Sequence, residues 1–383
     1  VDNSSGTPTL TLVVGSTNRT ATYVSGSGSS MLVFQYTIQS GENDSDGISI
    51  EADALALNSA ILSDPIGFPA VITHSAVSAN SSYLVDAQAP PVISFTLSDT
   101  ALKVGDNATV ILVFAEAVVS FSSSDDITVS NGSLDNMTSS DNIVWTGTFT
   151  PTPNTEDATN TLSLGTGYTD TAGNTGAAAT TANYEVETLA PTISGVAISS
   201  ATGVQNNFVN AGDVVSVTAT FSESVIVDNA SGTPTLTLIV GSTNRTSTYV
   251  SGSGSTPLVF QYTIQAGDND SNGISIGTNA LSLDNGTIRD AAGNNATLTH
   301  SSVADNSSYM VDAILPTVDS VEITSATTGM QNNFLNAGDV VSVTATFSEV
   351  VNKTGTPQLT LAVGSNNRTA TYASGTGSAP LVF

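Results

Sequence analysis

The sequence predicts an all-β protein made of tandem β-sandwich domains that are joined by short linkers containing proline. Three observations lead to this prediction. Apolar residues alternate with Ser and Thr in many short segments, which Gly-, Asn- and Ser-rich turns separate. No window of the sequence shows a sustained helical period of 3.6 residues. Long stretches recur at distant positions, as they do in a tandem array.

The alternation is clearest in the segment "DVVSVTATF". Val215, Val217 and Phe221 fall on one face of an extended chain, and Ser216 and Thr218 fall on the other. In the next part of the sequence, "TLTLIV" and "RTSTYV" flank the polar "GSTN", as the two strands of a hairpin would. Each of these segments is therefore predicted to be a strand with one buried face.

Internal repeats set the domain boundaries. Residues 1–90 align with residues 227–316 without a gap, and residues 203–225 match residues 329–351. Four domains follow: 1–90 without its first strands, 91–190 of a second and shorter type, 191–316 as the complete long repeat, and 317–383 without its last strands. The segments "DAQAPPV", "ETLAPTI" and "DAILPTV" mark the boundaries, where proline stiffens the linker.

The two incomplete repeats overlap, because residues 350–383 repeat what residues 1–34 contain. Strand donation between the two would make this overlap redundant. We therefore expect the chain to be a segment of a longer array, and exchange of strands between subunits is the less favoured alternative.

Several motifs together resemble a known family. "AGDVVSVTATFSESV", "DAAGN" and "VDAILPT" are similar to the bacterial Ig-like repeats of large secreted surface proteins and adhesins, and "WTGTFTPT" with "YTDTAGN" resembles a sister family of such repeats. The resemblance implies tandem Ig-like β-sandwiches in an extracellular stalk, fibre or adhesin at the cell surface, often with calcium between domains. The first domain departs from the pattern at Asp64, where the motif reads "DPIGF".

Composition excludes several classes of partner. Thirty-three acidic residues face 6 basic ones, for a net charge of −27, which disfavours binding to nucleic acid or to an anionic membrane surface. The chain has no cysteine, so disulfides and Cys-based metal sites are excluded. No stretch approaches the ~18 apolar residues of a membrane-spanning helix.

Strand geometry groups the acidic residues into sets. A strand of about 7–8 residues spans about 25 Å, so Asp213 and Glu223 flank one strand at opposite poles of the sandwich. Glu223 shares the N-terminal pole with the "DAAGN" turn and with the incoming linker. Three sets are therefore expected: Glu187, Glu223 and Asp290; Asp86, Glu116 and Asp170 at the preceding boundary; and Asp312 with Glu349 at the following one, which has no third member.

Carboxylate oxygens in such numbers suit Ca²⁺, which takes six to eight oxygen ligands. Calcium at the domain boundaries is therefore one reading of these sets. The alternative is that each Asp caps a turn and that Gly-Asn supplies a positive φ. The turn alone accounts for "DAAGN", but it leaves the recurring glutamates without a reason.

A second candidate for calcium is the segment "GDNDSNG". Its counterpart in the first domain is "GENDSDG", and both resemble the start of a D-x-[DN]-x-[DN]-G calcium loop. The residues are Asp268, Asp270 and Asn272 in one copy and Glu42, Asp44 and Asp46 in the other. Neither copy has the bidentate Glu at the twelfth position, so a plain β-turn is the favoured alternative.

Other polar residues indicate no chemistry. His74 and His300 occupy the same repeat position and have no nucleophile at a suggestive spacing, so both are expected to be structural. Trp145 is the only tryptophan and is expected to pack inside the second sandwich. Asn-x-Ser/Thr sequences such as the one at Asn131 are candidate sites for glycans, as in a glycoprotein.

The sequence thus predicts a structural extracellular protein and no enzyme. Its expected partners are neighbouring Ig-like repeats or like subunits in a fibre, and a host or cell-surface glycan or protein. Two alternatives stay open: a glycan- or partner-binding module of an adhesin, and a non-catalytic spacer of a secreted enzyme.

Overall fold

A computed structural model of the chain describes residues 1–326 and 330–383. Residues 327–329, which belong to the fourth predicted domain and include the first residue of the 329–351 repeat match, lie outside the described residues. The chain divides into two compact units. The first comprises Val1–Ala190 with Ala292–Asn294, and the second comprises Pro191–Ala291 with Asn295–Phe383.

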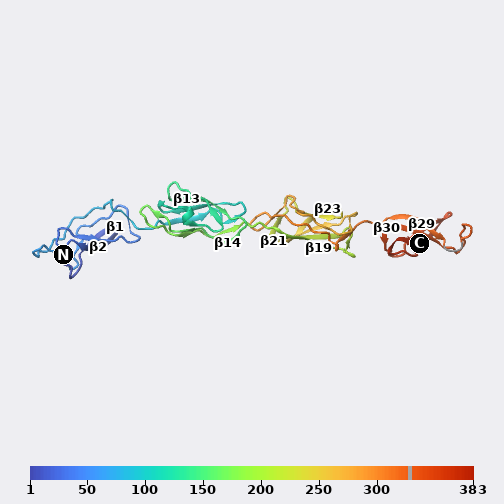
Figure 1. The fold of residues 1–383 in the computed structure, drawn as a ribbon, viewed down its shortest axis with the longest axis horizontal. Coiled ribbons are helices and arrows are strands. Elements are labelled where there is room, and N and C mark those ends of the chain that lie inside the picture. The colour runs from blue at the N-terminus through green and yellow to red at the C-terminus, as the bar shows by residue number, and fades with distance from the viewer. Residues whose placement is uncertain (327–329) are drawn as a thin grey trace. The chain divides into compact units, whose positions relative to one another are not determined.

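The first domain, in which Figure 1 labels β1 and β2, has a four-stranded sheet in the order β3-β2-β1-β5. The strands β1 and β2 form the predicted hairpin, with Val14 paired to Thr17 next to the turn. A separate pair joins β4 to β6. The bounds are β1 Thr9–Val14, β2 Thr17–Ser25, β3 Val33–Gln35, β4 Asn43–Asp44, β5 Leu55–Ala56 and β6 Val85–Asp86.

The second domain is a sandwich whose main sheet has the order β12-β13-β9-β7. The other sheets are β14-β18-β8, β11-β15-β17 and the pair β10-β16. The bounds are β7 Val92–Leu97, β8 Ala101–Lys103, β9 Ala108–Phe114, β10 Val118–Val119, α1 Ser123–Asp126, β11 Ile127–Thr128, β12 Gly132–Leu134, β13 Val144–Pro151, β14 Glu156–Asn160, β15 Ser163–Leu164, β16 Thr169–Asp170, β17 Ala179–Thr180 and β18 Tyr184–Glu187.

The core of this sandwich comes from alternate residues of its strands. Val110, Leu112 and Phe114 of β9 are fully buried, and they lie in one cluster with Phe149 and Tyr168. The burial of such aliphatic and aromatic side chains is the main source of stability for a sandwich of this size.

The third domain repeats the pattern of the first and adds two long strands, β19 and β21. Its main sheet runs β19-β21-β24-β23-β22-β26, with β27 paired to the end of β21, and a smaller sheet runs β20-β28-β25. The bounds are β19 Ile193–Ala201, β20 Phe208–Val209, β21 Val214–Asp228, β22 Thr235–Val240, β23 Thr243–Ser251, β24 Ser255–Thr263, β25 Asn269–Asp270, β26 Leu281–Ser282, β27 Thr287–Arg289 and β28 Met310–Asp312.

The fourth domain has a sheet of order β29-β30-β33 and a hairpin β31-β32. Its strands β29 and β30 correspond to β19 and β21 of the third domain, and they pair antiparallel as those strands do. The bounds are β29 Val318–Ala326, β30 Val341–Val351, β31 Gln358–Val363, β32 Asn366–Thr371 and β33 Ser378–Val382.

The predicted all-β architecture is confirmed. Among the described residues, every sheet draws all its strands from one of the four predicted ranges, and the only helix is the single turn α1. The alternation in "DVVSVTATF" places Val215, Val217 and Phe221 in the core, as predicted. No helix in the described part of the chain has the length and apolar character that crossing a bilayer requires.

Candidate metal centre

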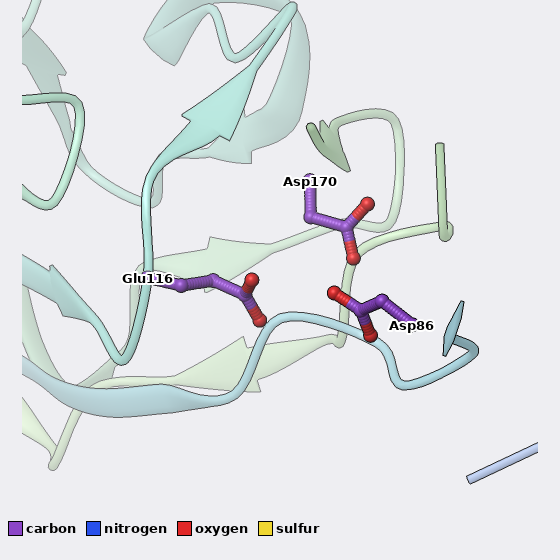
Figure 2. Close-up of side chains that lie close together, drawn as sticks. All are labelled: Asp86, Glu116 and Asp170. Carbon is purple, nitrogen blue, oxygen red and sulfur yellow. The ribbon is translucent and has the colours of Figure 1, made fainter. Parts of the chain in front are cut away.

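Three carboxylates that are far apart in the sequence lie together in the first unit. One oxygen from each of Asp86, Glu116 and Asp170 lies within 4.8 Å of the other two. Figure 2 shows the three side chains pointing toward one another from three separate segments. This is the set that strand geometry predicts for the boundary between the first and second domains.

Each member of the set is positioned by a different element. Asp86 ends β6, directly before the linker to the second domain. Glu116 lies between β9 and β10, where the amide of Ala115 donates to the carbonyl of Pro91 (2.9 Å) and holds this turn against the linker. Asp170 ends β16, which pairs with β10 so that Asp170 lies opposite Val118.

Asn174, the last residue of "DTAGN", is a member of the site that the sequence reasoning missed. Its side-chain amide donates to the Asp170 carboxylate (2.8 Å) and to the backbone carbonyl of Asp86 (3.1 Å). Its backbone amide donates to the other carboxylate oxygen of Asp170 (2.9 Å). Asn174 therefore orients one acidic side chain and fastens the linker to the second domain.

The recurrence of the motif was the signal that could have revealed this role. Ala292–Asn294 of the related "DAAGN" belong to the first unit, and there Asn294 donates to the carbonyl of Glu187 (2.9 Å). Glu187 occupies the position in its linker that Asp86 occupies in the preceding one. The final Asn of the motif thus bonds the linker carbonyl in both places.

The local electrostatics differ among the three carboxylates. Burial raises the pKa of Glu116, and the negative charges of Asp86 and Asp170 raise it further. Burial also acts to raise the pKa of Asp170, but hydrogen bonds from Asn174 and from the amides of Gly173 and Ala172 outweigh it and hold the pKa below its ordinary value. Hydrogen bonds thus stabilise the anionic form of Asp170, whereas the charges of the other two carboxylates destabilise the anionic form of Glu116.

The donor set fits a hard divalent cation. Three carboxylates offer up to six oxygens, and Ca²⁺ accepts six to eight at about 2.3–2.6 Å, with water in the remaining positions. Like charges about 4–5 Å apart repel by about 1 kcal/mol per pair in water and by more where solvent is partly excluded. A bound cation would replace this repulsion by attraction. Cation binding would therefore explain why three carboxylates lie so close together.

The other two predicted sets of acidic residues are not brought together in the way that the first set is. Glu187, at the end of β18, lies in the first unit, whereas Glu223, in β21, and Asp290, directly after β27, belong to the second. Within the second unit, Asp312 and Glu349 line the same cleft of about 530 Å³. One carboxylate oxygen of Glu349 is buried there without a hydrogen-bond partner among the described residues.

The acidic residues of the two candidate calcium loops are engaged by protein donors instead. Asp268 accepts from Arg245 (Nε, 2.8 Å), from the hydroxyl of Tyr262 (2.7 Å) and from the amide of Gln265 (2.9 Å). In the first domain Glu42 forms an ion pair with Arg19.

The central aspartates of these loops accept hydrogen bonds from backbone amides. Asp44 accepts from the amides of Gly15 (2.7 Å) and Gly47 (2.8 Å), and Asp270 accepts from the corresponding glycine amides. Asp46 is exposed, and Asn272 hydrogen-bonds Asp305. This arrangement favours the β-turn alternative, because the oxygens that a metal would need already hold the turn to the neighbouring hairpin.

The histidines and the tryptophan have structural surroundings. The Nε2 atom of His74 accepts from the amide of Ala54 (3.0 Å), and His300 accepts from Ala280 in the same way (2.8 Å). Trp145 packs on the core of the second domain, with its ring 4.8 Å from that of Phe121. The expected packing of Trp145 is confirmed.

One comparison with known proteins concerns the domain that carries this site. Residues 86–186 match the family model of the bacterial Ig-like domain. This part of the chain is similar to a bacterial Ig-like domain. The match starts at Asp86 and also contains Glu116 and Asp170, so all three carboxylates of the candidate centre lie within it. No curated protein matches the chain.

Three solved structures show distant likeness to the chain. The adhesin FdeC of Escherichia coli is 13% identical, with 77% of this chain and 88% of that chain covered and a TM-score of 0.26. The extracellular region of plexin A4 is 10% identical (99% and 31% covered, TM-score 0.19). SGBP-B of the mixed-linkage glucan utilization locus of Bacteroides ovatus, solved with a heptasaccharide, is 13% identical (97% and 87% covered, TM-score 0.14). TM-scores this low carry no inference about the chain.

Proposed function

We propose that the chain is part of an extracellular tandem array of Ig-like domains, a cell-surface stalk, fibre or adhesin, in which Ca²⁺ stiffens the boundary between the first and second domains. The observation that carries the proposal is the convergence of Asp86, Glu116 and Asp170. The bacterial Ig-like domain at residues 86–186 supports a structural or binding role at the surface rather than an enzymatic one.

The location of the three residues supports a stiffening role. Asp86 belongs to a strand of the first domain, whereas Glu116 and Asp170 belong to the second. A cation held by all three would therefore join two domains that the linker otherwise connects through few atoms. Asn174 orients the Asp170 carboxylate and holds the backbone carbonyl of Asp86, so one ligand and the backbone that carries a second are positioned before any cation binds.

Isothermal titration of the full chain with Ca²⁺ tests the proposal. The chain is first freed of metal by chelation, and the titration is repeated with the Glu116→Gln variant. We expect the variant to lose one equivalent of bound Ca²⁺, because a neutral amide with one oxygen replaces a carboxylate with two.

The matched control is Asp125→Asn, which removes the same charge from an exposed position in α1 of the same domain. This control separates loss of a ligand from a general loss of negative charge, and it should titrate like the unaltered chain. Equal stoichiometry for the unaltered chain and for Glu116→Gln would refute a calcium site at this boundary.

A further inference from the structure

We propose that the end of the strand pair β8–β18 in the second domain is a binding site for the side chain of Asn294, and that the Ala292–Asn294 loop acts as an intramolecular ligand of that domain. The loop belongs to the sequence of the third repeat, but its three residues lie in the first unit together with the second domain. The proposal does not depend on calcium, because neither of the hydrogen bonds that carry it involves a carboxylate.

The site consists of two backbone groups at the place where the parallel strands β8 and β18 end. Lys103 and Glu187 are the last pair in the register of these strands. The carbonyl of Glu187 and the amide of Val104, the residue after Lys103, lie at this end of the pair. Backbone donors and acceptors that are shielded from water need a hydrogen-bond partner, and here the register supplies no further strand residue.

Asn294 pairs with both groups through its side-chain amide. Its Oδ1 atom accepts from the backbone amide of Val104 (2.8 Å), and its Nδ2 atom donates to the carbonyl of Glu187 (2.9 Å). A side-chain amide carries a donor and an acceptor, as a peptide group does, so it extends the strand pair by one peptide-like group. An aspartate at this position would lack the donor, and an alanine would lack both groups.

The burial of Asn294 indicates that these two bonds matter for stability. The residue is 2% exposed, although asparagine is mostly an exposed residue type. A buried amide is stable only where hydrogen bonds replace its contacts with water. Gly293, with a φ of +97°, turns the loop, and a Cβ atom added there would lie 3.8 Å from the Nζ atom of Lys103. The loop therefore packs beside the end of β8.

The preceding copy of the motif supports this interpretation. Asn174, the final residue of "DTAGN", donates to the carbonyl of Asp86 (3.1 Å), which has the position in its linker that Glu187 has in the next one. Both copies thus direct the amide of their last asparagine at the backbone of a linker. A turn that only reversed its own chain would not need this side chain.

The consequence is that the stability of the second domain depends on a residue from the next repeat. A group that binds the folded state of a domain and not the unfolded state stabilises that domain. The Ala292–Asn294 loop is part of the same chain, so its effective concentration at the site is high. A change at Asn294 should therefore destabilise the second domain, although the sequence of that domain stays the same.

Urea denaturation of the full chain, followed by the fluorescence of Trp145, tests the proposal. Trp145 is the only tryptophan and belongs to the second domain, whereas Asn294 belongs to the third repeat. We expect Asn294→Ala to raise the unfolding equilibrium constant that Trp145 reports by about 10- to 30-fold, because two hydrogen bonds of a buried group are lost. Hydrogen exchange measured by NMR should be faster at the amide of Val104 in the same variant.

The adjacent residue supplies a matched control. Asn295 accepts a hydrogen bond from Arg289 of the third repeat (2.9 Å), so Asn295→Ala should change neither the Trp145 transition nor the exchange of the Val104 amide. A second variant, Asn294→Asp, keeps an oxygen for the Val104 amide and loses the donor to Glu187. Exchange at Val104 should be slower in Asn294→Asp than in Asn294→Ala.

Three outcomes would overturn the proposal. The first is a Trp145 transition that Asn294→Ala leaves unchanged. The second is an equal shift of this transition in Asn294→Ala and Asn295→Ala, because a general loss of stability in the third repeat would then explain the result. The third is equal exchange of the Val104 amide in Asn294→Ala and in the unaltered chain, because the amide would then have no bond to lose.

Discussion

Glu116 and Asp170 lie side by side, yet their surroundings move their pKa values in opposite directions. Burial and two neighbouring carboxylates raise the pKa of Glu116, whereas hydrogen bonds from Asn174 and from the amides of Gly173 and Ala172 outweigh the effect of burial and lower the pKa of Asp170. The site is therefore partly prepared for a cation. One ligand is held as an anion, and another has an unfavourable charge that a bound cation would relieve.

This difference predicts a change in pH dependence for Glu116→Gln. The pKa of Glu116 in the folded protein lies above its ordinary value of 4.5. Between these two pKa values the folded protein holds a proton that the unfolded chain has released. The free energy of unfolding therefore falls as the pH rises from the lower pKa to the higher one. Without metal, Glu116→Gln should avoid this fall and be slightly more stable at pH 7, by less than about 1 kcal/mol because solvent screens this partly buried group. The difference should vanish below about pH 4.

Fluorescence of Trp145 measures this effect, because the only tryptophan of the chain packs in the second domain and reports its unfolding. Urea titrations across the pH range are compared with and without Ca²⁺. With saturating Ca²⁺ the order should reverse, since only the unaltered chain gains the full binding energy. Identical pH profiles for the two proteins would contradict the assigned environment of Glu116.

At the scale of elements, the "DTAGN" loop works as a connector and not only as a turn. Gly173 has a φ of +93°, which allows the loop to turn back so that Asn174 reaches both Asp170 and the Asp86 carbonyl. The first domain has "DPIGF" at the same place, so Phe68 replaces the Asn there. Its side chain is 68% exposed and has no amide to donate.

We expect Asn174→Ala to lower the unfolding free energy of the second domain by about 1–2 kcal/mol, since two side-chain hydrogen bonds are lost and the Asp170 carboxylate loses a donor. Urea denaturation followed by Trp145 fluorescence, without calcium, is the measurement. Asn136→Ala, at an exposed position of the same domain, serves as the control and should change little. Equal stability of both variants and the unaltered chain would show that the connector has no structural role.

At the scale of the whole molecule, the net charge of −27 disfavours close packing of acidic surfaces unless cations are present. The candidate centre concentrates three of these charges where the first domain joins the second. The consequence concerns the motion of the first domain relative to the second. A cation at the boundary should restrict the linker, and its removal should free it.

Distances between two spin labels measure this restriction. Ser40→Cys in the first domain and Ser140→Cys in the second are both exposed positions. We expect the distance distribution from double electron–electron resonance to be narrower in Ca²⁺ than in a chelator, and Glu116→Gln to remove the narrowing. Equal widths in both conditions would mean that calcium does not stiffen this boundary.

Much of this architecture could be predicted from the sequence, because alternating residues and repeats are local or periodic signals. The convergence of Asp86, Glu116 and Asp170 was also accessible, since strand length and direction determine which ends meet. The contacts of Glu42 and Asp268 were not, because they depend on Arg19 and Arg245 reaching across from another strand. The hydrogen bond from Asn174 to the Asp86 carbonyl likewise depends on the position of a side chain, which the spacing of residues in the sequence does not predict.

The most direct test of the calcium site is an anomalous difference map from crystals of the full chain grown with Ca²⁺, recorded at a wavelength where calcium scatters anomalously. We expect a peak about 2.3–2.6 Å from at least one carboxylate oxygen of each of Asp86, Glu116 and Asp170. A well-ordered boundary with no peak at that place, or with the three carboxylates turned outward into water, would contradict it.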